Sequence, residues 1–400
     1  MFEAYSNDVL WIVVIGFLVA FFLAFGVGAN DVANSFGTSV GSKVLTLTQA
    51  CILATIFEIL GALLMGFKVS DTIRKDIYDL DMYENEEKVL MMGNMAALFG
   101  SATWNIIATL LRLPISGTHS IVGAVLGFTL VVKGFRGIQW KTLGFIVSSW
   151  FLSPVLSGVV SVIIFLLIRK FILSKDKPSQ VGVAFIYIIS VFINVLSIVL
   201  DGSPVPIEQA HEEISLENPI SKDENLMLTD DDHPEVRKLF KGLQIMTAIF
   251  GSFAHGGNDV SNAIAPLISL WLLYTKDTNG STPAWLLIYG GFGISIGLWV
   301  MGRKVIQTMG QDLTKITPLS GFTIEIGATT TVLLASKIGI PISTTHCKVG
   351  SIVFVGMTRS TNDVDFKLFK NIILAWLVTL PFTGVISGLT MLVLYSTTIS

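Results

Sequence analysis

Long stretches without charge constrain this chain more than any other feature. Six runs contain no Asp, Glu, Lys or Arg, and they cover residues 9–30, 89–111, 142–168, 181–200, 284–302 and 371–400. A helix that crosses a bilayer needs roughly 20 largely apolar residues. Further apolar stretches lie near residues 44–67, 113–132, 242–254, 260–274, 316–336 and 338–358. Because several are too short or too rich in glycine to cross simply, we predict an all-α polytopic membrane protein of about twelve transmembrane helices, including broken or re-entrant pieces.

The composition supports a lipid environment. The chain is 52% hydrophobic and only 14% charged, whereas soluble domains carry about 25% charged residues. We therefore expect a multi-pass protein of the cell membrane, which is the inner membrane if the source is prokaryotic. The lipid bilayer is its surrounding partner and no nucleic acid is expected. The formation of a homodimer is left open.

One acidic segment divides the chain. Residues 201–241 are polar and rich in Asp and Glu, unlike the sequence on either side. A segment of this composition favours a solvated loop. We predict three parts: a first hydrophobic repeat with a connecting helix (1–200), an acidic hydrophilic loop between the repeats (201–241), and a second hydrophobic repeat (242–400).

The two hydrophobic parts share two motifs in the same order. Residues 28–34 (GANDVAN) match residues 256–262 (GGNDVSN), and residues 113–119 (LPISGTH) match residues 340–346 (IPISTTH). Two matches with nearly the same offset indicate an internal duplication. Duplicated hydrophobic halves are typical of secondary transporters, often as inverted repeats. We predict two inverted repeats, although basic residues in the loops do not settle the orientation of the chain.

Carboxylates occur where lipid disfavours them. Asp31 and Asp259 end long apolar runs, and Glu58 and Glu325 lie inside such runs. A charge at the bilayer centre costs about 2.5–3.5 kcal/mol on insertion scales, so such residues are functional candidates. The alternative is structural, as helix caps or ion pairs. The candidate cation ligands are Asn30, Asp31, Glu58, Asn258, Asp259 and Glu325.

The glycines before each Asn-Asp pair predict a broken helix. Glycine weakens a helix and lets backbones approach closely. The amide end of a broken helix suits an anion. Its carbonyl end, with Asp and Asn oxygens, suits a hard cation such as Na⁺. The pattern therefore predicts adjacent sites for an anion and its coupling cation.

The two Pro-Ile-Ser segments predict an oxyanion cradle of neutral donors without a permanent positive charge. Proline favours a helix start, and hydroxyls and amides follow within one turn. Alternatively, the hydroxyls only satisfy broken backbone. His119 and His346 suit either a structural hydrogen bond or a donor to the anion, whereas His255 is read as structural because Val27 takes its place in the first half. The candidate anion-binding residues are Asp31, Asn34, Ser116, Gly117, Thr118, His119, Ser120, Asp259, Asn262, Ser343, Thr344, Thr345 and His346.

These motifs resemble the paired signature of the inorganic phosphate transporter (PiT) family. The resemblance rests on both Asn-Asp motifs, both Pro-Ile-Ser segments and residues 321–325 (GFTIE). It implies an inverted-repeat fold, a central phosphate site and alternating access. The positions that match residues important in the family are Asp31, Glu58, Ser116, Asp259, Glu325 and Ser343. Ala263 replaces the serine found at position 35, so a role for Ser35 is not symmetric.

The resulting hypothesis is secondary active transport of inorganic phosphate by symport with Na⁺. Phosphate is the substrate, Na⁺ is the coupling ion, and no other cofactor is expected. Carriers of the same fold for phosphate with H⁺, for a metal–phosphate complex or for sulfate are alternatives. Carboxylates without a clear histidine relay favour Na⁺ over H⁺. An intramembrane phosphatase with His119 or His346 as nucleophile is less favoured, because an enzyme does not need the duplication, and a passive channel would show no cation dependence. We therefore expect a transporter and not an enzyme.

Overall fold

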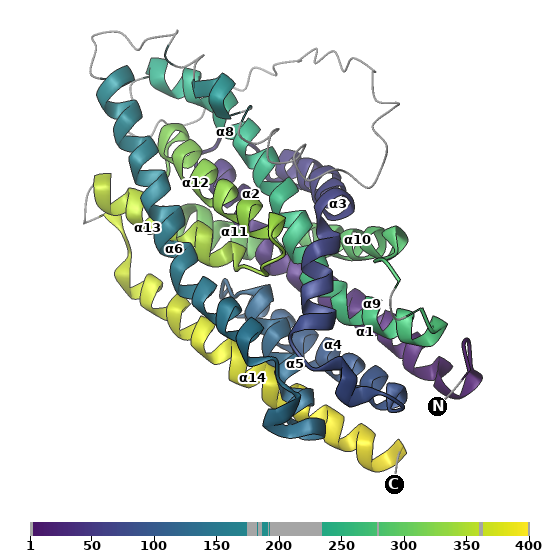
Figure 1. The fold of residues 1–400 in the computed structure, drawn as a ribbon. Helices are drawn as coiled ribbons and strands as arrows, with labels where there is room; N and C mark the ends of the chain where they lie inside the picture. Colours follow the sequence, from purple (N-terminus) through teal and green to yellow (C-terminus); the bar gives the residue numbers. More distant parts are fainter. Residues whose placement is uncertain are drawn as a thin grey trace.

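The computed structural model describes residues 3–173, 182, 186–190, 192, 234–277, 280–359 and 363–398. Within these ranges the regular elements are helices, with isolated antiparallel bridges between Tyr78 and Ile138 and between Thr314 and Val364 (Figure 1). Seven of the described helices are long and apolar enough to cross a membrane. The predicted all-α membrane class is therefore confirmed, whereas the number of about twelve helices remains a prediction. Most of the predicted run 181–200 lies outside the described residues.

Six α-helices lie within the described residues 3–173 of the first half. They are α1 (Asn7–Asp31), α2 (Ala33–Gly41), α3 (Leu47–Asp71), α4 (Glu87–Leu110), α5 (Gly117–Lys133) and α6 (Trp140–Ile168). Short π- or 3₁₀-helical turns are η1 (Thr72–Asp76), η2 (Leu80–Tyr83), η3 (Gly134–Gly137) and η4 (Arg169–Leu173). Large apolar side chains of α6, such as Phe151, face outward, as expected for contact with lipid.

The second half follows the same order. Its elements are α8 (Pro234–His255), η5 (Gly256–Val260), α9 (Ser261–Thr275), α10 (Ala284–Met301), α11 (Arg303–Gln307), η6 (Thr308–Asp312), α12 (Pro318–Lys337), α13 (Thr344–Arg359) and α14 (Phe366–Thr398). The predicted acidic loop lies outside the described residues up to position 233. Its last residues, from Pro234, form the first turns of α8.

Close glycine contacts show which helices correspond. A Cβ on Gly28 of α1 would lie 1.9 Å from the backbone oxygen of Ile294 in α10. A Cβ on Gly256, at the equivalent place, would lie 2.1 Å from the backbone oxygen of Glu58 in α3. Only glycine allows such an approach of two backbones. Glu58 and Ile294 therefore occupy equivalent positions in the two halves.

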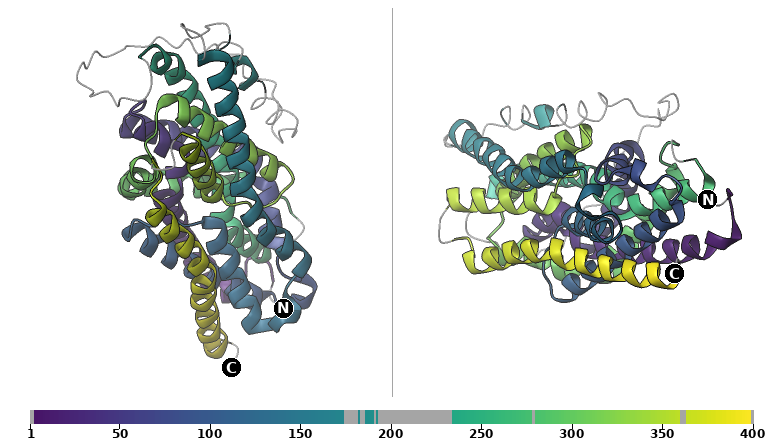
Figure 2. Two further views of the ribbon diagram at one scale, coloured as in Figure 1. Left: turned by 90° about the vertical axis from the view of Figure 1, so that its left-hand side faces the viewer. Right: turned by 60° about the horizontal axis from the view of Figure 1, so that its bottom comes forward.

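The two halves pack into one another. Helix α1 contacts α10, and its counterpart α8 contacts α3. Helix α6 lies against α12 and α13, whereas α14 lies against α4 and α5. Figure 1 shows α6 and α14 along the same side of the molecule, with α6 ending near the top and α14 ending at the C-terminus at the bottom. Two further views show the same interlocked helices (Figure 2).

Both Asn-Asp motifs lie where helical geometry breaks. Val32 separates α1 from α2, and the π-helical turn η5 separates α8 from α9. Such π turns are frequent at functional sites. The Pro-Ile-Ser segments precede the first turns of α5 and α13. The breaks and these two helix starts meet at the centre of the molecule.

Candidate functional site

Two threonines join the halves at the centre by matching hydrogen bonds. Thr118 Oγ1 donates to the Ile342 carbonyl oxygen (2.8 Å) and accepts from Asn262 Nδ2 (2.8 Å). Thr345 Oγ1 donates to the Ile115 carbonyl oxygen (2.7 Å) and accepts from Asn34 Nδ2 (2.9 Å). Each threonine thus contacts only the opposite half through these bonds. We call these six residues, Asn34, Ile115, Thr118, Asn262, Ile342 and Thr345, the threonine clasp.

The first asparagine of each motif holds a Pro-Ile-Ser segment. Asn30 donates to the Leu113 carbonyl oxygen (2.9 Å) and accepts from the Ile115 amide (3.0 Å). Asn258 Nδ2 donates to the Ile342 carbonyl oxygen (2.9 Å). The side-chain oxygens Asn258 Oδ1 and Asn262 Oδ1 are buried, with no hydrogen-bond partner among the described residues. Buried polar atoms usually have partners, so these two oxygens are candidate ligands.

The two aspartates approach the same point at the start of α5. Asp31 Oδ2 accepts a hydrogen bond from the Gly117 amide (3.0 Å). A Cβ on Gly117 would lie 2.6 Å from Asp31 Oδ2 and 3.7 Å from Asp259 Oδ1. Both carboxylates are 1% exposed. Adjacent carboxylates repel unless a cation or a proton compensates them, so the arrangement favours cation binding.

Neutral oxygens would complete such a cation site. The described part of the chain holds no group of three or more His, Cys, Asp or Glu residues placed to bind a metal ion. A cation here would combine the two aspartates with amide or carbonyl oxygens. Oxygen ligands of this kind suit Na⁺ in transporters with broken helices.

Glu58 reaches the centre through a histidine. His255 Nδ1 lies 2.6 Å from Glu58 Oε2, and its Nε2 lies 3.1 Å from Asp259 Oδ2 without hydrogen-bond alignment. Ser252 Oγ donates to the other Glu58 oxygen (3.1 Å). The histidine therefore bridges two carboxylates, a position that allows proton exchange. The interpretation of His255 as mainly structural remains a prediction, and the structure places its ring between Glu58 and Asp259.

Glu325 lies apart from the aspartates in a shell of hydroxyls. Its Oε1 accepts from Thr38 Oγ1 and from Ser39 Oγ (2.8 Å), and its Oε2 accepts from Thr247 Oγ1 (2.6 Å). Lys348 Nζ lies 3.5 Å from Thr38 Oγ1. Both charged residues are buried, Glu325 at 0% and Lys348 at 4% exposure. They form a buried charge pair linked by one hydroxyl.

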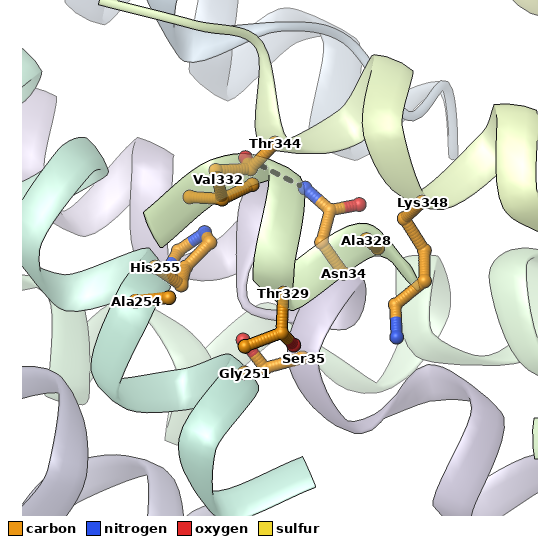
Figure 3. Close-up of a pocket in the computed structure, with 10 residues that line it drawn as sticks. All are labelled: Asn34, Ser35, Gly251, Ala254, His255, Ala328, Thr329, Val332, Thr344 and Lys348. Atoms are coloured by element: carbon orange, nitrogen blue, oxygen red, sulfur yellow. Dashed lines mark hydrogen bonds between the residues drawn. The ribbon is translucent and has the colours of Figure 1, made fainter. Parts of the chain in front are cut away.

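A small cavity of about 20 Å³, with both polar and apolar side chains in its lining, lies beside these groups. This is room for about one water molecule, so the site is closed around its centre. Figure 3 shows Asn34 between His255 and Lys348, with Thr344 hydrogen-bonded to Asn34. Ser35 and Thr329 also line the cavity. The cradle of neutral donors at the Pro-Ile-Ser segments remains a prediction, and the cavity beside it is lined by one lysine, Lys348.

The predicted hydroxyls of the cradle have several roles. Ser116 Oγ and Ser343 Oγ accept hydrogen bonds from the amides three residues later, at 3.2 and 3.1 Å. These two serines therefore cap α5 and α13. Ser120 Oγ faces α4, where it contacts Ser101 Oγ (2.7 Å) and accepts from Asn105 Nδ2 (3.0 Å).

The two predicted histidines form an aromatic stack. The ring centroid of His119 lies 3.7 Å from that of Trp150, and the His346 centroid lies 3.7 Å from that of Trp376. The two histidine centroids are 4.5 Å apart. His346 Nδ1 lies 2.9 Å from the Trp150 carbonyl oxygen. Their contacts fit packing of α5 and α13 against the two long helices α6 and α14.

Lys348 is a site residue that sequence reasoning missed. It interrupts the apolar stretch 338–358, and an ionisable residue inside such a stretch is itself a functional signal. The hydroxyls that hold the two glutamates carry no comparable signal, because serine and threonine are common in membrane helices. They are Thr38, Ser39, Thr247 and Ser252.

Known proteins resemble this chain over nearly its full length. The model of the phosphate transporter family matches residues 27–387. A zebrafish (Danio rerio) protein named sodium-dependent phosphate transporter 1-A is 36% identical, over 97% of this chain and 95% of its own. A mouse (Mus musculus) protein named sodium-dependent phosphate transporter 1 is 34% identical, over 96% and 95%. A solved structure titled "The sodium-dependent phosphate transporter" superposes with a TM-score of 0.84 at 35% identity, over 96% of this chain and 99% of that chain.

Proposed function

The chain belongs to the phosphate transporter family, and from this premise we propose that it carries inorganic phosphate across the cell membrane by symport with Na⁺. The observation that carries the proposal is the convergence of Asp31 and Asp259 on Gly117. The family and the similar proteins are transporters, so the phosphatase hypothesis is dropped and the chain is not assigned as an enzyme.

The cation site is proposed at the two aspartates. Their carboxylates lie close together, and within the described part of the chain hydrogen bonds and His255 are what compensates them. The free oxygens of Asn258 and Asn262 lie in the same motif as Asp259. A bound Na⁺ would relieve the repulsion between the carboxylates and satisfy these oxygens. Asn30 is not assigned to this cation site, because its side chain holds the first Pro-Ile-Ser segment by hydrogen bonds.

Phosphate is proposed to bind beside this cation, at the starts of α5 and α13. Helix starts present free amides and a partial positive charge to an anion. The Gly117 amide currently donates to Asp31. A cation that binds Asp31 weakens this hydrogen bond and leaves the amide available to a phosphate oxygen. Cation binding thereby prepares the anion site, which couples the two ions as symport requires.

Alternating access is proposed to proceed by motion of the interlocked halves. The reciprocal packing and the opposite directions of α6 and α14 support two inverted repeats. The threonine clasp crosses the boundary between the halves four times. These hydrogen bonds must exchange partners when the closed cavity opens to either side, so they are expected to control the transition.

The bridging position of His255 makes proton coupling a second candidate. Its ring nitrogens contact Glu58 and Asp259, so a proton has a route between the two carboxylates. In this version the carboxylates form a relay in place of a Na⁺ site. The same experiment separates the two candidates.

The test is uptake of radiolabelled phosphate into proteoliposomes under a Na⁺ gradient, an H⁺ gradient or neither. We expect uptake with the Na⁺ gradient alone, competed by excess unlabelled phosphate and not by sulfate. Uptake with only the H⁺ gradient would select the second candidate. Absence of uptake under every gradient, with folded protein, would contradict the proposal.

A further inference from the structure

Glu325 and Lys348 are charged residues of the second half whose counterparts in the first half are uncharged. The spacing of 227 residues that separates Pro114 from Pro341 places Leu98 opposite Glu325 and Ile121 opposite Lys348. The same spacing relates the ends of α4 at Leu110 and α12 at Lys337. Both counterparts are apolar and buried. The two charges are thus present together in one repeat and absent together from the other, which indicates that they act as a pair.

The surroundings of Glu325 and Lys348 stabilise charged side chains. Two hydroxyls from α2 and one from α8 donate to the Glu325 carboxylate. Lys348 Nζ contacts one of these, the Thr38 hydroxyl, at 3.5 Å. A buried ammonium requires an opposite charge nearby, and Glu325 supplies it through Thr38. Among the described residues the ammonium has no closer hydrogen-bond partner, so it is held loosely.

Lys348 also lines the small central cavity. In Figure 3 its side chain lies on one side of Asn34 and His255 lies on the other. On the His255 side, Glu58 and Asp259 lie close to the cavity, because both contact that histidine. Lys348 is therefore the cation on the side of the cavity away from those carboxylates. An anion that enters the cavity meets this ammonium.

We propose that Lys348 exchanges partners during transport: its ammonium is held near Glu325 while the cavity is empty, and it turns to phosphate when the anion enters. The inference rests on the proposed function and deepens it, since it names the residue that recognises the anion. Glu325 then loses its counter-charge and takes up a coupling cation from solution. Phosphate binding thus creates a cation site at Glu325.

The chemistry of lysine suits this exchange. One ammonium cannot fully compensate both a carboxylate and a phosphate, and a buried carboxylate left alone is strongly disfavoured. Lysine is a compact charge on a flexible stem, whereas arginine binds oxyanions with a rigid, two-pronged group. A flexible point charge can release the anion again. The exchange therefore gives positive coupling between phosphate and cation, which holds in both directions.

The test compares phosphate binding and uptake for the wild-type chain, Lys348→Gln, Glu325→Gln and the double variant. Radiolabelled phosphate binding to detergent-purified protein is measured over a range of Na⁺ concentrations, and uptake is measured in proteoliposomes. Lys141→Gln, at the exposed start of α6, is the matched control for loss of one lysine. Thermal unfolding of each variant reports folding.

Lys348→Gln is expected to weaken phosphate binding by about tenfold or more, the effect of one lost charged hydrogen bond. Glu325→Gln is expected to bind phosphate at least as tightly as the wild type, with a shallower Na⁺ dependence, because no cation is needed at that position. The double variant has no unpaired charge, so its thermal stability is expected to exceed that of Lys348→Gln.

Two results would contradict the partner exchange of Lys348. Unchanged phosphate affinity in Lys348→Gln, or an unchanged Na⁺ dependence in Glu325→Gln, overturns the inference while the proposed function stands. If Lys348→Gln does not fold, Glu325→Gln and the double variant decide by the same criteria. Absence of phosphate binding and uptake by the wild-type chain overturns the inference together with the proposed function.

Discussion

The threonine clasp and the buried charge pairs lie together at the centre of the molecule. The clasp is repeated in both halves, whereas the charge pairs are not. In the clasp, Thr118 and Thr345 make equivalent bonds to the opposite halves. Around it, Glu58 pairs with His255 and Glu325 lies near Lys348. The counterparts of all four charged or titratable residues are apolar: Ile294, Val27, Leu98 and Ile121.

This difference indicates that symmetric and asymmetric residues have two different tasks, which are to hold the halves together and to bind ions. Symmetric contacts suit a frame that must look alike from both sides of the membrane during alternating access. Charges that occur in one repeat only give a single site with distinct positions for an anion and its cations. The asymmetric charges are therefore candidates for ion recognition beside the two equivalent aspartates, Asp31 and Asp259, whereas the symmetric clasp holds the halves together.

Gly117→Ala is expected to give the largest effect. Its added Cβ would lie 2.6 Å from Asp31 Oδ2, so the carboxylate must move from the α5 helix start. A displacement of about 1 Å in such a site can reduce the rate about a hundredfold, and we expect a loss of that size in Na⁺-driven phosphate uptake. Gly144→Ala is the control, because no atom lies within 4 Å of its added Cβ. Full uptake by Gly117→Ala would contradict the convergence of the aspartates.

His255→Val makes the second half resemble the first, where Val27 stands at this position. Glu58 and Asp259 then lose their shared partner. We expect uptake to fall about tenfold or more, since a buried carboxylate without its partner is costly. The double variant Glu58→Gln/His255→Val is expected to recover thermal stability relative to His255→Val. If His255→Val retains normal uptake and pH dependence, the bridge is not part of transport.

Thr118→Val and Thr345→Val test the symmetry of the clasp. Each removes one donated and one accepted hydrogen bond between the halves. Buried groups left unsatisfied cost about 1–3 kcal/mol, so we expect a similar loss of stability in thermal unfolding for both variants. A large loss for one threonine and none for the other would show that the clasp is not symmetric in energy.

Glu86→Gln tests a charge pair outside the centre and is expected to have the smallest effect. Lys133 Nζ contacts Glu86 Oε2 at 2.9 Å, but the Glu86 side chain is 47% exposed. Exposed ion pairs contribute about 0–1 kcal/mol. We expect uptake to be unchanged and stability to fall by less than about 1 kcal/mol. A loss of transport would mean that a charge pair outside the centre is also needed for transport, so that the central position of a pair does not decide its importance.

Sequence repeats located much of this site, because they are local patterns. The duplicated Asn-Asp motifs identified both helix breaks, and the Pro-Ile-Ser segments identified the starts of α5 and α13. The partners of the glutamates could not be found in this way. Glu58 and His255 are 197 positions apart in the sequence, and only packing of α3 against α8 brings them together. Lys348 was detectable from its place in an apolar stretch, but its proximity to Glu325 depends on the packing of α12 and α13.

Phosphate binding by Asp31→Asn and Asp259→Asn at increasing Na⁺ concentration tests most directly whether the two converging aspartates form the cation site. Both variants keep the size of the side chain and remove its charge, and Lys141→Gln is measured beside them as a control. We predict that Na⁺ strengthens phosphate binding to the wild-type and control proteins, by a factor of about 5–150 as is typical of coupled sites. Each aspartate variant is predicted to lose this dependence on Na⁺. Binding that remains equally Na⁺-dependent in both variants would contradict a cation site at the converging aspartates.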